Sequence, residues 1–208
     1  MKRCGMSKGW LFFDIGSTLV DESECYQKRC EDIVRESSVS IEEFQKKMEE
    51  FARKKKSAFI AAAKYYDLPV PGWHSELEVL YPDAEEVLSA LSKRYNIGII
   101  ANQSLGSKER LQKFGILQYI QLVTASAEEG VSKPELEIFR IALQRAGCKP
   151  AHAFMIGDRL DNDIIPAKEI GMHTIWVRQG FAKYQFADNE NEIPDAQVDS
   201  LKELMGIF

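Results

Sequence analysis

The sequence predicts an α/β fold, with a Rossmann-like parallel sheet flanked by helices and a small all-helical cap domain. From residue 82 onward, helical segments alternate with short apolar runs, which is the order of elements typical of a parallel sheet. Between residues 21 and 66 apolar residues recur only at helical spacing. The stretch 68–72 is rich in Pro and Gly and cannot continue a helix. We therefore expect a core of residues 1–20 and 72–208 and a cap of residues 21–71.

The first strand is predicted at Trp10–Phe13, a short apolar run that breaks at Asp14. In the cap, Ser40-Ile41-Glu42-Glu43 forms a capping-box pattern that opens a helix. Phe44, Met48 and Phe51 give that helix an apolar stripe.

The remaining elements of the core follow from apolar periodicity, with glycines at 115, 147 and 171 as helix stops. Helices are predicted at Pro82–Arg94, Lys108–Phe114, Glu135–Ala146, Asp161–Ile170 and Ser200–Met205, and strands at Ile97–Ile100, Tyr119–Val123, Ala153–Ile156 and Thr174–Val177.

Composition and charge narrow the class of protein. The 208 residues are 45% hydrophobic and 28% charged, an ordinary balance for a globular protein. With 27 basic and 32 acidic residues the net charge is −5, which argues against nucleic acid as a partner. No apolar run reaches the roughly 18 residues of a membrane span.

The cysteines indicate a compartment. The four of them, Cys4, Cys25, Cys30 and Cys148, form no CxxC pair, so reduced thiols in the cytoplasm are expected. No exposed heptad seam indicates a homodimer, although the cap offers a surface for one.

Polar residues follow three of the predicted strands. Asp14 follows the first strand, Asn102 the strand that ends at Ile100, and Asp158 the strand that ends at Ile156. The carboxyl ends of parallel strands share one edge of a sheet, so these side chains should meet there. Carboxylates suit Mg²⁺, and Lys133 in a nearby loop would add a cation. Together they form a set suited to handling phosphate.

Four short motifs carry these residues in order: Phe12 to Leu19, Ile100 to Gln103, Lys133-Pro134, and Gly157 to Asp163. In this combination the chain resembles the haloacid dehalogenase-like (HAD) hydrolase superfamily, with a helical cap inserted after the first motif. The resemblance implies a hydrolase, expected to be a phosphatase acting on a small phosphorylated metabolite. Asp14 would be the nucleophile and form an aspartyl-phosphate intermediate.

The resemblance also implies the remaining roles. Lys133 would offset the charge of Asp14 and hold the phosphoryl oxygens. Mg²⁺ would be bound by Asp14, the carbonyl of Gly16 and Asp158. Asp163 would belong to the same metal site and support these ligands from the next layer of residues. The further substrate-binding candidates are Ser17, Thr18 and Asn102.

Two positions depart from the family pattern. Gly16 stands where phosphatase members carry a second Asp that acts as general acid and base, and Ala101 stands where they carry Thr or Ser. Because general acid–base catalysis contributes about 10²–10⁴-fold, simple alkyl phosphates are expected to be poor substrates.

Several explanations of these departures stay open at this point. Either the leaving group needs no proton, or Asp21, His74 or a cap residue supplies one. A second explanation is a different reaction, either cleavage of a C–halogen bond or cleavage of a C–P bond that uses a cap lysine. A non-catalytic protein that only binds its ligand is the remaining alternative. The candidate lysines are Lys54, Lys55, Lys56 and Lys64.

Overall fold

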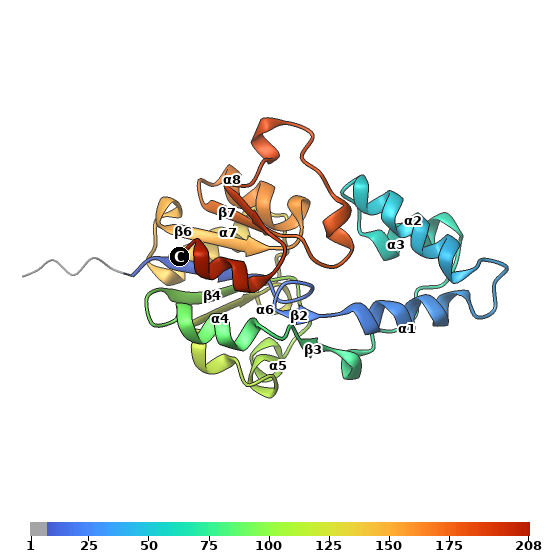
Figure 1. Cartoon of the computed structure of the whole chain (residues 1–208), viewed down its shortest axis with the longest axis horizontal. Helices are drawn as coiled ribbons and strands as arrows, with labels where there is room; N and C mark the ends of the chain where they lie inside the picture. Colours follow the sequence, from blue (N-terminus) through green and yellow to red (C-terminus); the bar gives the residue numbers. More distant parts are fainter. Residues whose placement is uncertain (1–7) are drawn as a thin grey trace, which may run out of the picture.

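The computed structural model describes residues 8–208, so Cys4 and the rest of residues 1–7 lie outside the description. Its centre is a six-stranded parallel sheet in the order β5-β4-β1-β6-β7-β8 (Figure 1). This architecture confirms the predicted fold class. The strands are β1 (Trp10–Phe13), β4 (Asn96–Ala101), β5 (Leu122–Ala125), β6 (Ala153–Gly157), β7 (His173–Val177) and β8 (Ala196–Val198).

Helices cover both faces of this sheet because successive side chains of each strand point to opposite sides. In β1, Leu11 and Phe13 pack with α4 (Ala84–Leu91), whereas Phe12 packs with α7 (Leu136–Ala146). The other core helices are α5 (Ser107–Lys113), α6 (Ser126–Glu129) and α8 (Ile165–Glu169). Within residues 8–208, no helix has the length and apolar character needed to cross a membrane.

Three helices lie to one side of the sheet (Figure 1): α1 (Ser23–Val34), α2 (Ile41–Arg53) and α3 (Ala58–Tyr65). They have an apolar core of their own, built around Cys30, Phe44, Met48 and Phe59. The predicted capping box is confirmed at the start of α2. The backbone N–H of Glu43 donates to the Ser40 hydroxyl at 3.2 Å, and that of Ser40 donates to the Glu43 carboxylate at 3.0 Å.

The chain enters and leaves these helices through paired segments. A two-stranded antiparallel ribbon joins β2 (Val20–Asp21) to β3 (Val79–Leu80). The helices meet the sheet domain again beyond α2, where the Lys55 ammonium contacts the carboxylates of Asp188, at 2.5 Å, and Glu192. The helical unit is therefore tied to the rest of the molecule at two separate places.

Several predicted boundaries are wrong. The strand predicted at Tyr119–Val123 is found at Leu122–Ala125, and a 3₁₀ turn occupies Leu117–Tyr119. That turn buries Leu117 and Tyr119 partly against the core, so its apolar residues look like the start of a strand.

Other differences concern the ends of helices. The helix predicted at Pro82–Arg94 is shorter, Ala84–Leu91, and the one predicted at Asp161–Ile170 begins with a π-helical turn at Leu160–Ile164. The last segment is a 3₁₀ helix at Leu201–Gly206, and β8 was not predicted at all. Short elements of this kind have too few residues to show a period.

Close packing of the central strands gives a first prediction. A Cβ added to Gly98 would lie 2.5 Å from the ring of Phe12, which is fully buried and stacks on Trp10. Because this ring has no free space to enter, Gly98→Ala should lower the free energy of unfolding by about 1–3 kcal/mol. Urea denaturation measures this loss. Gly72→Ala is the control, since a Cβ there meets no atom of the described part of the chain within 4 Å. Equal midpoints for the two variants would contradict the expectation.

Candidate active site

The loops that follow β1, β4 and β6 open into a single cavity of about 590 Å³. Asp14 comes directly after β1, Asn102 directly after β4 and Asp158 directly after β6, and all three line this cavity. Gly16, Ser17 and Lys133 line it as well. The carboxyl edge of the sheet thus gathers most of the residues singled out in the sequence.

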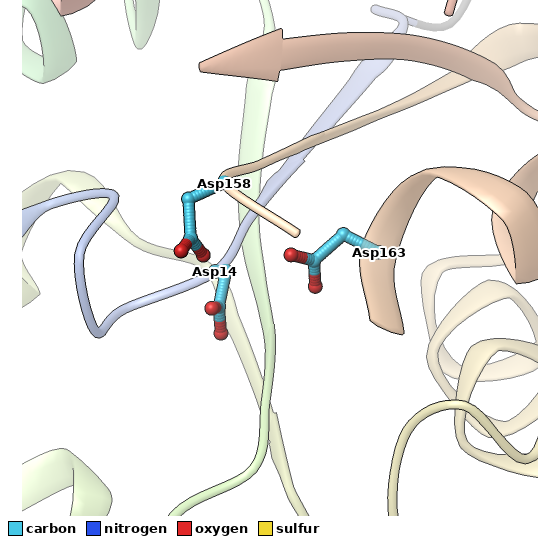
Figure 2. A group of neighbouring side chains, drawn as sticks. All are labelled: Asp14, Asp158 and Asp163. Carbon is cyan, nitrogen blue, oxygen red and sulfur yellow. The ribbon is translucent and has the colours of Figure 1, made fainter. Parts of the chain in front are cut away.

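Three carboxylates form a compact cluster at this edge (Figure 2). Oxygens of Asp14, Asp158 and Asp163 all lie within 4.8 Å of one another. Asp14 and Asp158 project from the ends of their strands, and Asp163 faces them from the helical turn beyond Asp158. Asp158 and Asp163 are buried, whereas the side chain of Asp14 is 13% exposed.

Lys133 lies inside this cluster. Its ammonium nitrogen is 2.7 Å from Oδ1 of Asp14 and 2.5 Å from Oδ1 of Asp163, and it donates to the carbonyl of Ile100 at 2.9 Å. Burial alone would lower the pKa of Lys133, but the charges of Asp14 and Asp163 outweigh it and raise the pKa above its usual value. The lysine therefore stays positive and has three acceptors for its three protons.

Negative charge exceeds positive charge in this cluster. Burial, followed by the charges of Asp163 and Asp14, raises the pKa of Asp158 well above its ordinary value. One lysine does not balance three carboxylates, so a divalent cation bound by oxygen ligands fits the residues present. Asp14 and Asp158 are the carboxylates suited to hold it, with Gly16 beside them in the cavity.

Asp163 is already engaged on both oxygens. Oδ1 meets Lys133, and Oδ2 accepts a hydrogen bond from the backbone N–H of Arg159 at 2.9 Å. Gly157 allows this close approach, because a Cβ there would lie 2.5 Å from the Asp163 carboxyl group. Asp163 is thus placed to orient Lys133.

Asn102 is also turned toward the lysine. Its side-chain oxygen accepts from the backbone N–H of Lys133 at 2.7 Å, and its side-chain nitrogen donates to the Lys133 carbonyl at 2.8 Å. Both ends of the amide are used by one residue. These two hydrogen bonds hold the backbone at Lys133, and Asn102 also lines the cavity, so its contact with substrate stays a prediction.

The two hydroxyl residues after Gly16 differ in their placement. Ser17 lines the cavity in a left-handed conformation, with φ 55°, and its hydroxyl donates to the Glu22 carboxylate at 3.2 Å. Thr18 is fully buried, and its hydroxyl has no hydrogen-bond partner among residues 8–208. The structure does not place Thr18 on the cavity wall.

Sequence reasoning missed several charged residues of this cavity. Glu22 lines it from the start of α1, and Arg29 lines it from the middle of that helix. Arg110 and Arg159 line it from the core. Arg159 lies within the fourth motif, where the resemblance gave it no role, and no motif marks Glu22, Arg29 or Arg110.

Alternatives left open by the sequence are placed as follows. Asp21 lines a neighbouring cavity, and His74 lies between Asp32 and Glu76, at 2.7 and 3.1 Å. Of the four candidate lysines, Lys55 is held by acidic partners and Lys56 lines a small adjoining cavity. Within residues 8–208, the lining of the cavity that contains Asp14 includes neither Asp21 nor His74, and it includes none of the four candidate lysines.

The fold and site together define a Rossmann-like α/β protein with a buried carboxylate–lysine centre at the carboxyl edge of its sheet. The model of the haloacid dehalogenase-like hydrolase family matches residues 11–177. The chain belongs to this family, as its motifs indicated.

Curated relatives carry phosphatase names. The chain is 36% identical over 131 residues to glyceraldehyde 3-phosphate phosphatase of Methanopyrus kandleri, a match that covers 61% of this chain and 55% of that protein. It is 29% identical over 222 residues to the protein of the same name from Pyrococcus furiosus, covering 95% and 92%. The chain thus spans only about half the length of the first of these relatives.

A solved structure extends the similarity to the whole fold. The crystal structure of a HAD phosphatase from Thermococcus onnurineus has a TM-score of 0.65 to this chain at 26% identity. The match covers 96% of this chain and 97% of the other.

Proposed function

We propose that the protein is a Mg²⁺-dependent phosphatase that hydrolyses a small phosphorylated metabolite through an aspartyl-phosphate on Asp14. The observation that carries the proposal is the contact of Asp14 with Lys133, at 2.7 Å, on the wall of a cavity of about 590 Å³. A cavity of this volume suits a small molecule. The phosphatase names of the relatives support the same reaction class.

Each residue of the cluster has a part in this mechanism. The Asp14 carboxylate attacks phosphorus, and Lys133 lowers the repulsion between that carboxylate and the incoming phosphate. Asp163 and Asn102 fix the lysine in place. Mg²⁺ held by Asp14, Asp158 and the carbonyl of Gly16 would neutralise charge on the phosphoryl oxygens. Arg29, Arg110 and Arg159 add positive charge to the cavity wall.

The helical unit α1–α3 is proposed to act as the cap of this site. Two of its residues, Tyr26 and Arg29, line the cavity, so the cap would shape the space open to the substrate and exclude water. The protein is proposed to work in the cytoplasm, where Cys25, Cys30 and Cys148, which are free, would stay reduced.

Metal binding can be tested without turnover. At free Mg²⁺ about 100-fold above Kd, binding adds about 2.7 kcal/mol of stability, equivalent to a rise in Tm of roughly 5–10 °C. Asp158→Asn should lose this rise. Without metal it should be at least as stable as the wild type, because it removes one of three clustered carboxylates.

The matched control is Glu137→Gln, an exposed carboxylate on α7 that should leave the Mg²⁺ response unchanged. Differential scanning calorimetry with and without Mg²⁺ gives the comparison. An equal rise in Tm for Asp158→Asn and the wild type would show that the cation binds elsewhere.

The reaction itself is tested by phosphate release from acetyl phosphate and para-nitrophenyl phosphate, with and without Mg²⁺. We expect turnover that requires Mg²⁺. Release of phosphate only from a phosphonate, or of halide from a haloacid, would overturn the proposed reaction.

A further inference from the structure

The proposed reaction needs a proton donor and a base. Breaking the P–O bond of an alkyl phosphate requires a proton on the departing oxygen, and hydrolysis of the aspartyl-phosphate requires a base for water. Asp14 and Asp163 are paired with Lys133, and Asp158 belongs to the cluster that fits a cation. None of these three carboxylates is free for proton transfer to the substrate.

Glu22 fills a space that glycine leaves open. A Cβ built on Gly16 would lie 2.5 Å from Oε1 of Glu22 and 2.9 Å from both Cδ and Oε2. The Glu22 carboxylate therefore occupies the volume that a side chain two residues after Asp14 would take. Gly16 and Glu22 are complementary in shape, because any larger residue at position 16 would displace the carboxylate.

The carboxylate of Glu22 makes few strong contacts with other side chains. Glu22 is the N-cap residue of α1, yet within the described structure its side chain makes no capping hydrogen bond. Ser17 donates to Oε2 at 3.2 Å, and the nearest Arg110 nitrogen is 3.8 Å from Oε1. That same Arg110 nitrogen is 2.7 Å from Glu78, so the arginine pairs closely with Glu78 and leaves Glu22 loosely held.

Glu22 also shares the cavity wall with the reacting groups. Its side chain is 12% exposed and lines the same cavity as Asp14 and Lys133. It directly precedes α1, the first helix of the proposed cap, which would face the part of the substrate beyond the phosphate. Its position is thus suited to the leaving group.

We propose that Glu22 is the general acid and base of the reaction, supplying from α1 the carboxyl group that position 16 lacks. This inference rests on the proposed phosphatase function. In the first step an Asp14 oxygen bonds to phosphorus, the P–O bond to the alcohol breaks, and the Glu22 carboxyl gives its proton to the departing oxygen. In the second step Glu22 takes a proton from water, whose oxygen bonds to phosphorus while the bond to Asp14 breaks. The sum is phosphate ester plus water giving alcohol plus phosphate.

Substitution by glutamine separates the two steps. Glu22→Gln keeps the shape of the side chain and an acceptor for Ser17, but it cannot transfer the proton. On an alkyl sugar phosphate we expect kcat/KM to fall by about 10²–10⁴-fold. On para-nitrophenyl phosphate, whose leaving group needs little protonation, we expect a burst of about one equivalent of nitrophenolate followed by slow turnover.

Glu24→Gln is the matched control, because Glu24 is an exposed carboxylate in the first turn of the same helix. It should behave as the wild type on both substrates. Loss of rate by the same factor on both substrates, with no burst in Glu22→Gln, would overturn the proposal, since a merely structural role predicts that result.

An exchange of positions tests the geometry directly. Glu22→Ala should lose turnover of the alkyl phosphate. The double variant Gly16→Asp/Glu22→Ala should turn over the alkyl phosphate at least tenfold faster than Glu22→Ala, because the new carboxylate enters the space that Glu22 left. The proposal is wrong if the double variant forms the phosphoenzyme from para-nitrophenyl phosphate at the wild-type rate but turns over the alkyl phosphate as slowly as Glu22→Ala. Absence of a phosphoenzyme in the wild type would instead overturn the proposed function.

Discussion

Asp14→Asn is expected to lose phosphate release by a factor on the order of 10⁴–10⁶, the usual cost of removing a catalytic nucleophile. The amide matches the carboxylate in shape but cannot form the acyl phosphate. The cavity and Lys133 remain, so binding of inorganic phosphate should change far less than turnover. Initial rates with acetyl phosphate, together with phosphate titration by calorimetry, give the two quantities.

Asp67→Asn is the control for this substitution. It makes the same chemical change at a left-handed position, φ 53°, which Asn tolerates well. Its rate should equal that of the wild type. Retention of Mg²⁺-dependent turnover by Asp14→Asn would mean that another residue attacks phosphorus.

The second large effect concerns Lys133. Its side chain is 2% exposed and that of Asp163 is fully buried, so Lys133→Met leaves buried carboxylates without their cation. Removing one partner of a buried pair costs about 3–5 kcal/mol. We expect that loss in urea denaturation without added Mg²⁺, together with loss of activity.

The double variant Lys133→Met/Asp163→Asn separates stability from catalysis. It removes one of the stranded charges, so it should be more stable than Lys133→Met while staying inactive. The change in unfolding free energy of the double variant is compared with the sum for Lys133→Met and Asp163→Asn. If the two values are equal, the Lys133–Asp163 contact at 2.5 Å contributes no coupling energy.

Sequence reasoning succeeded where chemistry and topology agree. Asp14 and Asp158 were predicted at one edge because each follows an apolar strand and the strands are parallel. Lys133 was expected near the same edge as a cation from a loop, and the family resemblance added its role beside Asp14. These three residues meet in the structure as expected.

Side-chain direction was beyond the sequence. Ser17 and Thr18 are neighbours of the same type, yet Ser17 lines the cavity and Thr18 is buried. The tight turn decides between them through the left-handed conformation of Ser17. Asn102 lines the cavity, as expected of a substrate-binding candidate, but the sequence did not reveal that its amide pairs with the backbone of Lys133, 31 positions away.

Glu22 shows the same limit most clearly. The sequence reveals that position 16 has no side chain, but only the structure reveals which carboxylate fills the space. The turn after β1 and the start of α1 bring the two residues together. The sequence left open that a cap residue supplies the proton, and the packing of Glu22 against Gly16 is the observation that points to this residue.

The most direct test of the account is to trap the covalent intermediate. Acid quench within the first turnover of radiolabelled acetyl phosphate with Mg²⁺, followed by peptide mapping, should find a hydroxylamine-sensitive phosphate on the peptide that contains Asp14. The label should be absent in Asp14→Asn. Turnover of acetyl phosphate with no label on the protein, or with the label on another residue, would contradict the aspartyl-phosphate mechanism.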